Sequence, residues 1–304
     1  IMAKRIGWAR IKALINENTG TGLGTHRNWV MRATGSTTAG IQGSTGLVVG
    51  KNLDSSAKPA IANPFAESST QLWDFGTLLH YGDRTYRYAG IGSGAVTAGK
   101  LLQAAALTNA NHRDIAVQAA AAAGTSEVSV TVGGDTDSAI NLFAGGYLHC
   151  NDVAGQGQLL RIKSHEAHDF GNDGATLTLT LHDAVDTALT TSTKVDLITN
   201  PYNDLIVAPT TFTGPVIGVT AMDMTANYFG WVQIAGPCSV GLDVNPTGAT
   251  EELGGLVIRS DDTAGFCMGI GVVTGDADLA HQVIGTLMVN NGDTDNVVVW
   301  LNHL

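Results

Sequence analysis

One short stretch has the spacing of a phosphate-binding loop. Gly94 to Lys100 fits G-x-x-x-x-G-K, in which backbone N–H groups and a lysine hold phosphates. The next residue is Leu101, where that loop needs a hydroxyl group for magnesium. The preceding segment, Arg84 to Ala89, alternates polar and apolar residues, unlike the buried parallel strand of a nucleotide-binding fold. We therefore expect a glycine-rich turn and no nucleotide hydrolysis.

A second stretch, SHEAHD, gathers two histidines and two acidic residues. A zinc protease needs histidines four residues apart on one helix face, whereas His165 and His168 are three apart between two strand-like segments. Gly-Asp-x-Asp runs begin at Gly134, Gly275 and Gly292, but none continues into the twelve-residue loop of a calcium site. Such aspartates end strands by bonding their own backbone. We expect a solvated loop and tight turns, with metal or calcium binding as the alternative.

The cysteines do not indicate a disulfide framework or a structural zinc site. Cys150, Cys238 and Cys267 are widely spaced and form no C-x-x-C pair. Small apolar core residues in a reduced protein are the simpler interpretation. No Gly-x-Ser-x-Gly elbow is present, and no Ser/His or Cys/His arrangement stands out. We predict no enzyme activity and no catalytic, cofactor-binding or metal site.

Charge is distributed unevenly along the chain. The net charge is −11, but residues 1–35 hold six basic side chains against the single acid Glu17, so this segment is +5 and the remainder is −16. A basic arm of this kind suits an acidic protein surface. Nucleic-acid binding is less favoured, because the arm has no dense basic cluster and the acidic body would repel phosphates. The candidate contact residues are Lys4, Arg5, Trp8, Arg10, Lys12, Arg27, Trp29 and Arg32.

Residues 1–70 are expected to form an extended N-terminal arm. They are rich in Gly, Ser, Thr, Asn and Pro, with too little apolar surface to offset the entropy of ordering. Only Ile11 to Asn16 could form a short helix. Neither a signal-peptide-like run nor the roughly 20 apolar residues of a membrane span occurs, so we expect a protein made and kept inside a cell.

Residues 71–304 are expected to form a β-rich body, with a possible insertion or second β subdomain at about 108–207. Only 14% of residues are charged and 38 are glycine, which suits short strands joined by tight turns. In Thr176 to Leu181, threonine and leucine alternate strictly. Further strand-like runs cover residues 128–132, 159–163, 194–198, 256–259, 266–273 and 297–301. The pattern predicts an all-β sandwich or barrel of short antiparallel strands with at most one or two short helices.

Two hairpins share a pattern of valine, isoleucine, glycine and tryptophan. Val216 precedes Trp231 by 15 residues and Val283 precedes Trp300 by 17. We expect the first hairpin to end at Gly236-Pro237. Alanine-rich residues 115–123 predict a short helix capped by Gly124, and residues 101–106 could form a strand of small residues. The predicted core residues are Tyr86, Tyr88, Leu177, Leu179, Leu181, Trp231, Ile234 and Trp300.

Several segments, taken in their order along the chain, resemble a family of tailed-bacteriophage virion proteins encoded near the major capsid protein. The segments are GDRTYRYAG…AGKLLQAA (82–105), GGYLHCNDVAGQGQLLRIKSHEA (145–167), ATLTLTLHDAVDTALTTSTKVDLITNPYNDLIV (175–207), GPVIGVTAMDMTANYFGWVQIAGPCSV (214–240) and VIGTLMVNNGDTDNVVVWLN (283–302). Together they cover about residues 72–304. The resemblance implies a non-enzymatic head decoration or structural protein, often a symmetric oligomer.

We therefore expect a capsid decoration (cement) protein on the outer surface of a virion, made in the host cytoplasm. Its expected partners are the major capsid protein and neighbouring copies of itself in a trimer, with no membrane partner. The arm would be the anchor, and the acidic body would face outward. One alternative is a major coat or fibre subunit of the particle. Another is a secreted carbohydrate-active β protein, which would need paired carboxylates on neighbouring strands.

Overall fold

A computed structural model describes residues 30–32, 46–49, 62–134, 137–243, 252–270, 282–291 and 295–302 of the chain. Within these ranges the protein consists of antiparallel strands, and its two helical segments are short: the 3-10 helix η1 (Ala110–His112) and the helix α2 (Phe170–Asp173). The strands form one sheet of twelve and one of six, shaped as a half-barrel and a nearly closed barrel. The predicted all-β fold is confirmed.

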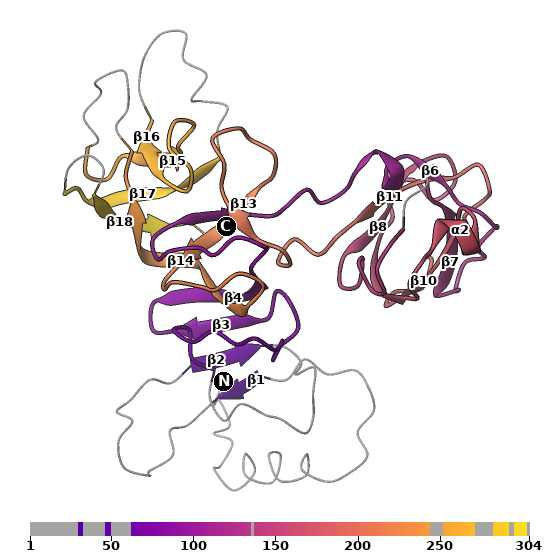
Figure 1. The fold of residues 1–304 in the computed structure, drawn as a ribbon, viewed down its shortest axis with the longest axis horizontal. Coiled ribbons are helices and arrows are strands. Elements are labelled where there is room, and N and C mark those ends of the chain that lie inside the picture. The colour runs from indigo at the N-terminus through magenta and orange to yellow at the C-terminus, as the bar shows by residue number, and fades with distance from the viewer. Residues whose placement is uncertain are drawn as a thin grey trace, which may run out of the picture.

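The twelve-stranded sheet follows the order β1-β2-β3-β4-β14-β18-β17-β15-β16, and a branch from β14 continues through β13 and β5 to β12. Figure 1 shows this path as a tall stack, with β1 at one end and β15 and β16 at the other. Its strands are β1 (Val30–Arg32), β2 (Gly46–Val49), β3 (Leu78–Tyr81), β4 (Arg84–Gly90), β5 (Leu101–Gln103), β12 (Ile206–Val207), β13 (Val216–Thr220), β14 (Phe229–Gly241), β15 (Leu256–Arg259), β16 (Cys267–Gly269), β17 (Val283–Val289) and β18 (Asn296–Leu301).

Strand β14 joins the two halves of this sheet. Its residues up to Ala235 pair with β4, and those from Gly236 onward pair with β18. Gly236 has φ of +86° and lies so close to the Asp83 carbonyl that a Cβ would collide with it. The side chain of Gln233 donates to the carbonyls of Ala235 (3.1 Å) and Pro237 (2.8 Å). The prediction that the strand stops at Gly236-Pro237 is therefore wrong, because β14 passes through a register shift between Gln233 and Ala235 and continues to Gly241.

Two strands from the first 70 residues belong to the larger sheet. β2 pairs with β3 from Gly46↔Tyr81 to Val49↔Leu78, and β1 pairs with β2. The chain therefore enters the sheet before residue 71. The helix expected at residues 11–16 lies outside the described residues.

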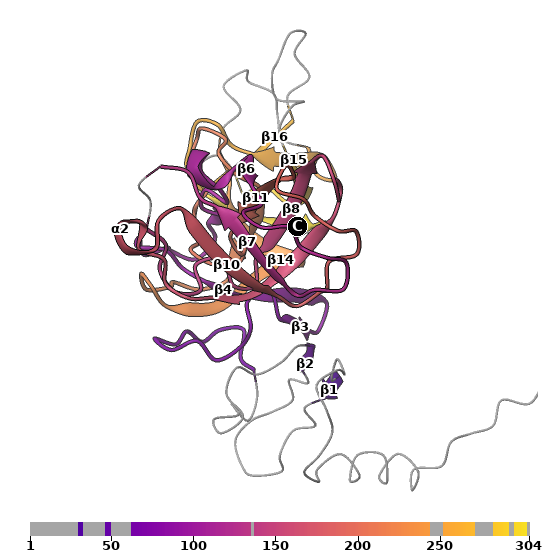
Figure 2. The same ribbon diagram turned by 90° about the vertical axis from the view of Figure 1, so that its right-hand side faces the viewer.

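The six-stranded sheet follows the order β6-β11-β8-β9-β10-β7. A bridge between Val117 and Val130 connects its first and last strands, and Figure 2 shows the sheet curled around its interior. We call this unit the barrel. Its strands are β6 (Ile115–Ala116), β7 (Glu127–Thr131), β8 (Tyr147–Asp152), β9 (Leu159–His165), β10 (Thr176–Leu181) and β11 (Lys194–Ile198).

The helix predicted at residues 115–123 is absent, although alanine favours helices. Its backbone groups bond to distant parts of the barrel instead. Gln118 N–H donates to the Ser129 carbonyl at 2.8 Å, and Ala121 exchanges two hydrogen bonds with Leu189. Pairing across the barrel thus overrides the local helical preference. The small-residue strand expected at residues 101–106 is present as β5.

Separate hydrophobic clusters fill the barrel and the larger sheet. Leu177, Leu179 and Leu181 of β10 point into the barrel core. In the larger sheet, the centre of the Trp231 ring lies 5.2 Å from the ring centre of Tyr88 and 6.1 Å from that of Trp73. Seven of the eight predicted core residues are buried as expected: Tyr86, Tyr88, Leu177, Leu179, Leu181, Trp231 and Ile234.

Candidate interaction surface

The predicted contact residues of the arm lie almost entirely outside the described residues. Arg32 is the last residue of β1, whose backbone pairs with Leu47 of β2. The other seven candidates fall outside the described ranges: Lys4, Arg5, Trp8, Arg10, Lys12, Arg27 and Trp29.

Trp300 does not belong to the core, contrary to the sequence-based prediction. Its side chain is 43% exposed, whereas its neighbours Val299 and Leu301 are buried. Successive side chains of a strand point to opposite faces of a sheet. Val299 and Leu301 enter the core cluster between β14, β17 and β18, so Trp300 faces outward.

Cross-strand pairing extends this outward face over four strands. Trp300 pairs with Thr286 of β17 and with Pro237 of β14, and Thr286 in turn pairs with Leu256 of β15. Directly paired residues lie on the same face of an antiparallel sheet. We call this row the outer face: it comprises Leu256, Thr286, Trp300 and Pro237, with Val298 and Val289 as a second pair beside it.

The outer face is apolar and carries no ionisable side chain. Leu256 is 49% exposed and Val289 43% exposed, similar to Trp300. Large apolar patches on soluble proteins commonly mark sites of contact with other proteins. Aromatic side chains are enriched, and charged ones depleted, at the centres of such interfaces. The composition of this face suits lasting contact with a protein surface.

The two histidines of the SHEAHD stretch are buried, so the predicted solvated loop is wrong for them. His165 is 4% and His168 3% exposed. Nε2 of His165 accepts a hydrogen bond from Phe143 N–H at 3.1 Å, and its Nδ1 donates to the Glu166 carbonyl at 2.7 Å. Nε2 of His168 donates to the Gly174 carbonyl at 2.8 Å. These bonds hold the loops at one end of the barrel together.

A third buried histidine, His112 of η1, completes a cluster that the sequence did not indicate. The centre of the Phe143 ring lies 4.9 Å from the ring centre of His112 and 5.5 Å from that of His165. Burial lowers the pKa of His112, and the neighbouring His168 and His165 lower it further. Burial also lowers the pKa of His165, against the opposing effect of the Glu166 carbonyl. The neutral imidazole of His165 therefore acts as a hydrogen-bonding group, whereas that of His112 packs on Phe143 and its buried Nε2 has no hydrogen-bond partner.

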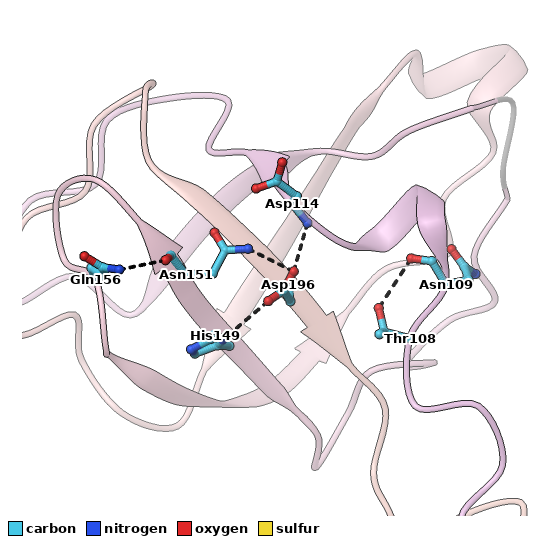
Figure 3. A network of polar contacts seen from close by, with 7 residues as sticks. All are labelled: Thr108, Asn109, Asp114, His149, Asn151, Gln156 and Asp196. Atoms are coloured by element: carbon cyan, nitrogen blue, oxygen red, sulfur yellow. Dashed lines mark hydrogen bonds and ion pairs between the residues drawn. The ribbon is translucent and has the colours of Figure 1, made fainter. Parts of the chain in front are cut away.

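A polar network centred on Asp196 lies at the surface of the barrel (Figure 3). Asp196 Oδ1 accepts from the backbone N–H of Asp114 at 2.8 Å and from Asn151 Nδ2 at 3.1 Å. Its Oδ2 lies 3.1 Å from His149 Nδ1, and Gln156 donates to the Asn151 carbonyl at 3.1 Å. One carboxylate thereby connects β8, β11 and the turn before β6. All its contacts serve to hold these segments together.

The segment with phosphate-loop spacing forms turns in the larger sheet, as expected. Gly99 has φ of +77°, and its N–H donates to the Thr220 carbonyl at 2.8 Å. The Lys100 ammonium lies 3.7 Å from the centre of the Phe266 ring, and burial lowers its pKa. The lysine thus packs on an aromatic ring instead of facing a cradle of backbone N–H groups.

The Gly-Asp-x-Asp runs are only partly described. Asp137 Oδ1 accepts from Phe170 N–H at 2.9 Å and so connects its loop to the first residue of α2. Most of the runs beginning at Gly275 and Gly292 lies outside the described residues. In the described ranges, no group of three or more His, Cys, Asp or Glu side chains is placed to hold a metal ion. Nor does any described helix have the length and apolar character to cross a membrane.

Comparison with known proteins adds no further assignment. No protein-family model, curated protein or solved structure matches the chain.

Proposed function

We propose that this chain is a non-enzymatic structural protein that decorates and stabilises an assembled viral capsid. The observation that carries the proposal is the outer face around Trp300. It exposes Leu256, Val289 and Trp300 on one side of a well-packed sheet and carries no charge. A decoration protein needs a contact surface of this kind, because it remains bound to a shell that other subunits have built.

The distribution of charge supports attachment at two places. The first 35 residues carry +5, whereas the remainder carries −16. Copies of the acidic body repel one another except through uncharged surfaces such as the outer face. The arm enters the sheet at β1, at the opposite end of the strand order from β15 and β16. Two linked contacts bind more tightly than either alone when both can be engaged together.

In this proposal the major capsid protein contacts both the arm and the outer face, and neighbouring copies of the chain complete a trimer on the capsid surface. Stabilisation follows from mass action. Binding to the assembled shell but not to free capsid subunits shifts the equilibrium toward the shell in proportion to occupancy. The bulk of the acidic body faces outward, because the basic arm is the part that anchors the chain to the shell.

Co-sedimentation with assembled heads and with unassembled capsid subunits tests the proposal. The chain should sediment with heads at a fixed stoichiometry and leave free subunits in the supernatant. Trp300→Ser should lower occupancy at limiting protein, whereas Ile140→Ser, a matched loss of an exposed apolar side chain on the barrel, should not. Equal binding by both variants would exclude the outer face as the contact.

Deletion of residues 1–29 tests the arm while it keeps β1 and β2 in place. The shortened chain should lose the part of its affinity that weakens with salt, because exposed charges are screened beyond about 8 Å at physiological ionic strength. In high salt, Trp29→Ala should weaken binding more than Arg32→Ala. Full, salt-independent occupancy by the shortened chain would show that the arm is incidental.

A further inference from the structure

A pocket of about 430 Å³ lies between the barrel and the larger sheet. Residues of two connecting segments, 104–109 and 199–205, form part of its lining. Figure 1 shows these segments running between the two units. The larger sheet and the second connecting segment supply Asn203, Asp204, Asn227 and Phe229, and the barrel side supplies Asn109 and Phe143. Residues that are far apart in the sequence thus line the same pocket.

Two glycines at the end of β4 leave room for the polar groups of this pocket. A Cβ on Gly92 would lie 2.6 Å from Oδ1 of Asp204. A Cβ on Gly90 would lie 3.1 Å from Oδ1 of Asn203 and 3.4 Å from the Phe229 ring. Both distances to oxygen are shorter than ordinary van der Waals contacts, so any side chain at Gly92 would displace the carboxylate. Because Gly90 and Gly92 have no side chains, the side-chain oxygens of Asn203 and Asp204 can occupy the adjacent space.

Backbone hydrogen bonds fix the same groups in position. Leu205 N–H donates to the Gly90 carbonyl, Gly92 N–H to the Leu205 carbonyl and Asn227 N–H to the Gly92 carbonyl, each at 2.9 Å. Asp204 and Asn227 have φ of +57° and +61°, a left-handed conformation that Asn and Asp tolerate better than most residues. Their side chains extend from backbone that is already held, so a ligand need not order it.

The chemistry of the lining favours a neutral ligand with many hydroxyl groups. Among the described lining residues there is one carboxylate, Asp204, no lysine or arginine, and three asparagine amides. An amide both donates and accepts hydrogen bonds, as a sugar hydroxyl does, whereas a cation needs acceptors alone. The partly exposed phenyl ring of Phe229 offers apolar surface to the C–H face of a sugar, while the buried ring of Phe143 closes the wall behind it. Anions are disfavoured by the carboxylate and by the net charge of −11.

We infer that this pocket binds one residue of a neutral saccharide. Asp204 and the amides of Asn203 and Asn227 would hydrogen-bond its hydroxyl groups. Hydrolysis is not part of the inference, because glycoside hydrolysis uses a pair of carboxyl groups flanking the bond, and Asp204 is the single carboxylate among the described lining residues. The inference does not depend on the proposed attachment to a capsid, since it concerns a different surface.

Titration of the full-length protein with D-glucose, D-galactose, N-acetylglucosamine and N-acetylgalactosamine tests this inference by NMR. At least one of these sugars should bind saturably at millimolar concentration and shift the amide signals of Asn203, Asp204 and Asn227. Asp204→Ala should weaken that binding by about tenfold or more, since hydrogen bonds to charged groups are among the stronger ones. Asp83→Ala removes an exposed carboxylate from the β3–β4 turn and should leave the binding unchanged.

A second variant, Gly92→Ala, tests the construction of the pocket. It should weaken sugar binding at least as much as Asp204→Ala, because its methyl group occupies the place of the carboxylate. Circular dichroism and thermal unfolding show whether the Gly92→Ala variant folds. If it does not fold, the sugar affinity of Asp204→Ala alone tests the inference. The inference is overturned if none of the four sugars binds saturably, if Asp204→Ala binds as the wild type does, or if Nα-acetyl-lysine amide binds more tightly than every sugar.

Discussion

Trp231 and Trp300 lie in the second strands of two antiparallel hairpins whose first strands begin Val-Ile-Gly, yet one is 3% and the other 43% exposed. The pairing differs, since Trp300 lies opposite Thr286 and the equivalent residue of the first hairpin, opposite Val219, is Gln233. In both hairpins a glycine, Gly218 or Gly285, lies against a carbonyl of the partner strand where a Cβ would collide. The hairpins therefore share their close backbone approach. They differ in what covers the tryptophan, since Trp231 packs on Tyr88 and Trp73 and Trp300 lies on the outer face.

This difference predicts that the same substitution at the two tryptophans lowers stability by very different amounts. Trp231→Ala should lower the free energy of unfolding by about 3–5 kcal/mol, as expected for a large side chain removed from a core. Trp300→Ala should lower it by about 1 kcal/mol or less. Urea denaturation followed by circular dichroism measures both. A loss of several kcal/mol in Trp300→Ala would mean that this side chain is part of the core.

The close packing of Gly236 within β14 predicts a strong effect of a small substitution. Gly236→Ala should lower the free energy of unfolding by more than about 2 kcal/mol, because the methyl group meets the Asp83 carbonyl and the positive φ disfavours a side chain. Gly124→Ala is the matched control, since Gly124 has φ of +91° with nothing within 4 Å of its Cβ position. It should cost about 1 kcal/mol. Similar melting temperatures for the two variants would contradict this explanation.

The buried histidines predict that the barrel loses stability in mild acid. The pKa values of His112 and His165 are lowered in the folded state, so the unfolded chain takes up protons first. Their contribution is complete above the unfolded pKa of about 6.5 and is lost as the pH falls from there toward the folded pKa. The slope is at most about 1.4 kcal/mol per pH unit for each histidine. The other titratable groups that act on the pair are His168 and Glu166.

Urea midpoints measured from neutral pH to about pH 5 check this prediction, since the titration window begins near the unfolded pKa of histidine. His112→Gln should flatten the dependence, and His80→Gln, in β3 of the larger sheet, should leave it unchanged. A midpoint that stays constant over this range in the wild type would rule out the histidines as the acid-sensitive groups.

The cysteines should not react with a thiol reagent in the folded protein. All three are buried and none forms a disulfide, and burial raises the pKa of Cys238 to about 12 and that of Cys150 above its usual value. The reactive thiolate is therefore scarce and covered. An Ellman assay should detect no thiol in native buffer and three in denaturant. Rapid labelling without denaturant would show that a cysteine is accessible.

Strands with strict alternation could be predicted from the sequence to the residue. Thr176–Leu181 forms β10 with Leu177, Leu179 and Leu181 inside, because one polar and one apolar face specify which side is buried. Trp300 could not be placed in this way. The run Val297 to Leu301 is apolar on both faces, and a strand with two apolar faces does not reveal which of them the core covers.

Features that depend on distant pairing could not be predicted. The alanines of residues 115–123 favour a helix locally, but hydrogen bonds to Ser129 and Leu189 decide their structure. The pocket likewise combines Asp204, Asn227 and Phe143 from three separate segments, and none of these segments carries a recognisable motif. Such sites arise from topology, which local composition does not encode.

Imaging of purified virus particles, produced with the gene for this chain present, tests the central claim most directly. Electron cryo-microscopy of wild-type particles, compared with particles that lack the chain, should show a difference density repeated at equivalent positions on the outer surface of the head. The copy number should match that lattice, and trimeric density is expected. Density confined to the tail or a fibre, a continuous shell built by the chain itself, or the absence of the chain from particles would contradict the proposed decoration role.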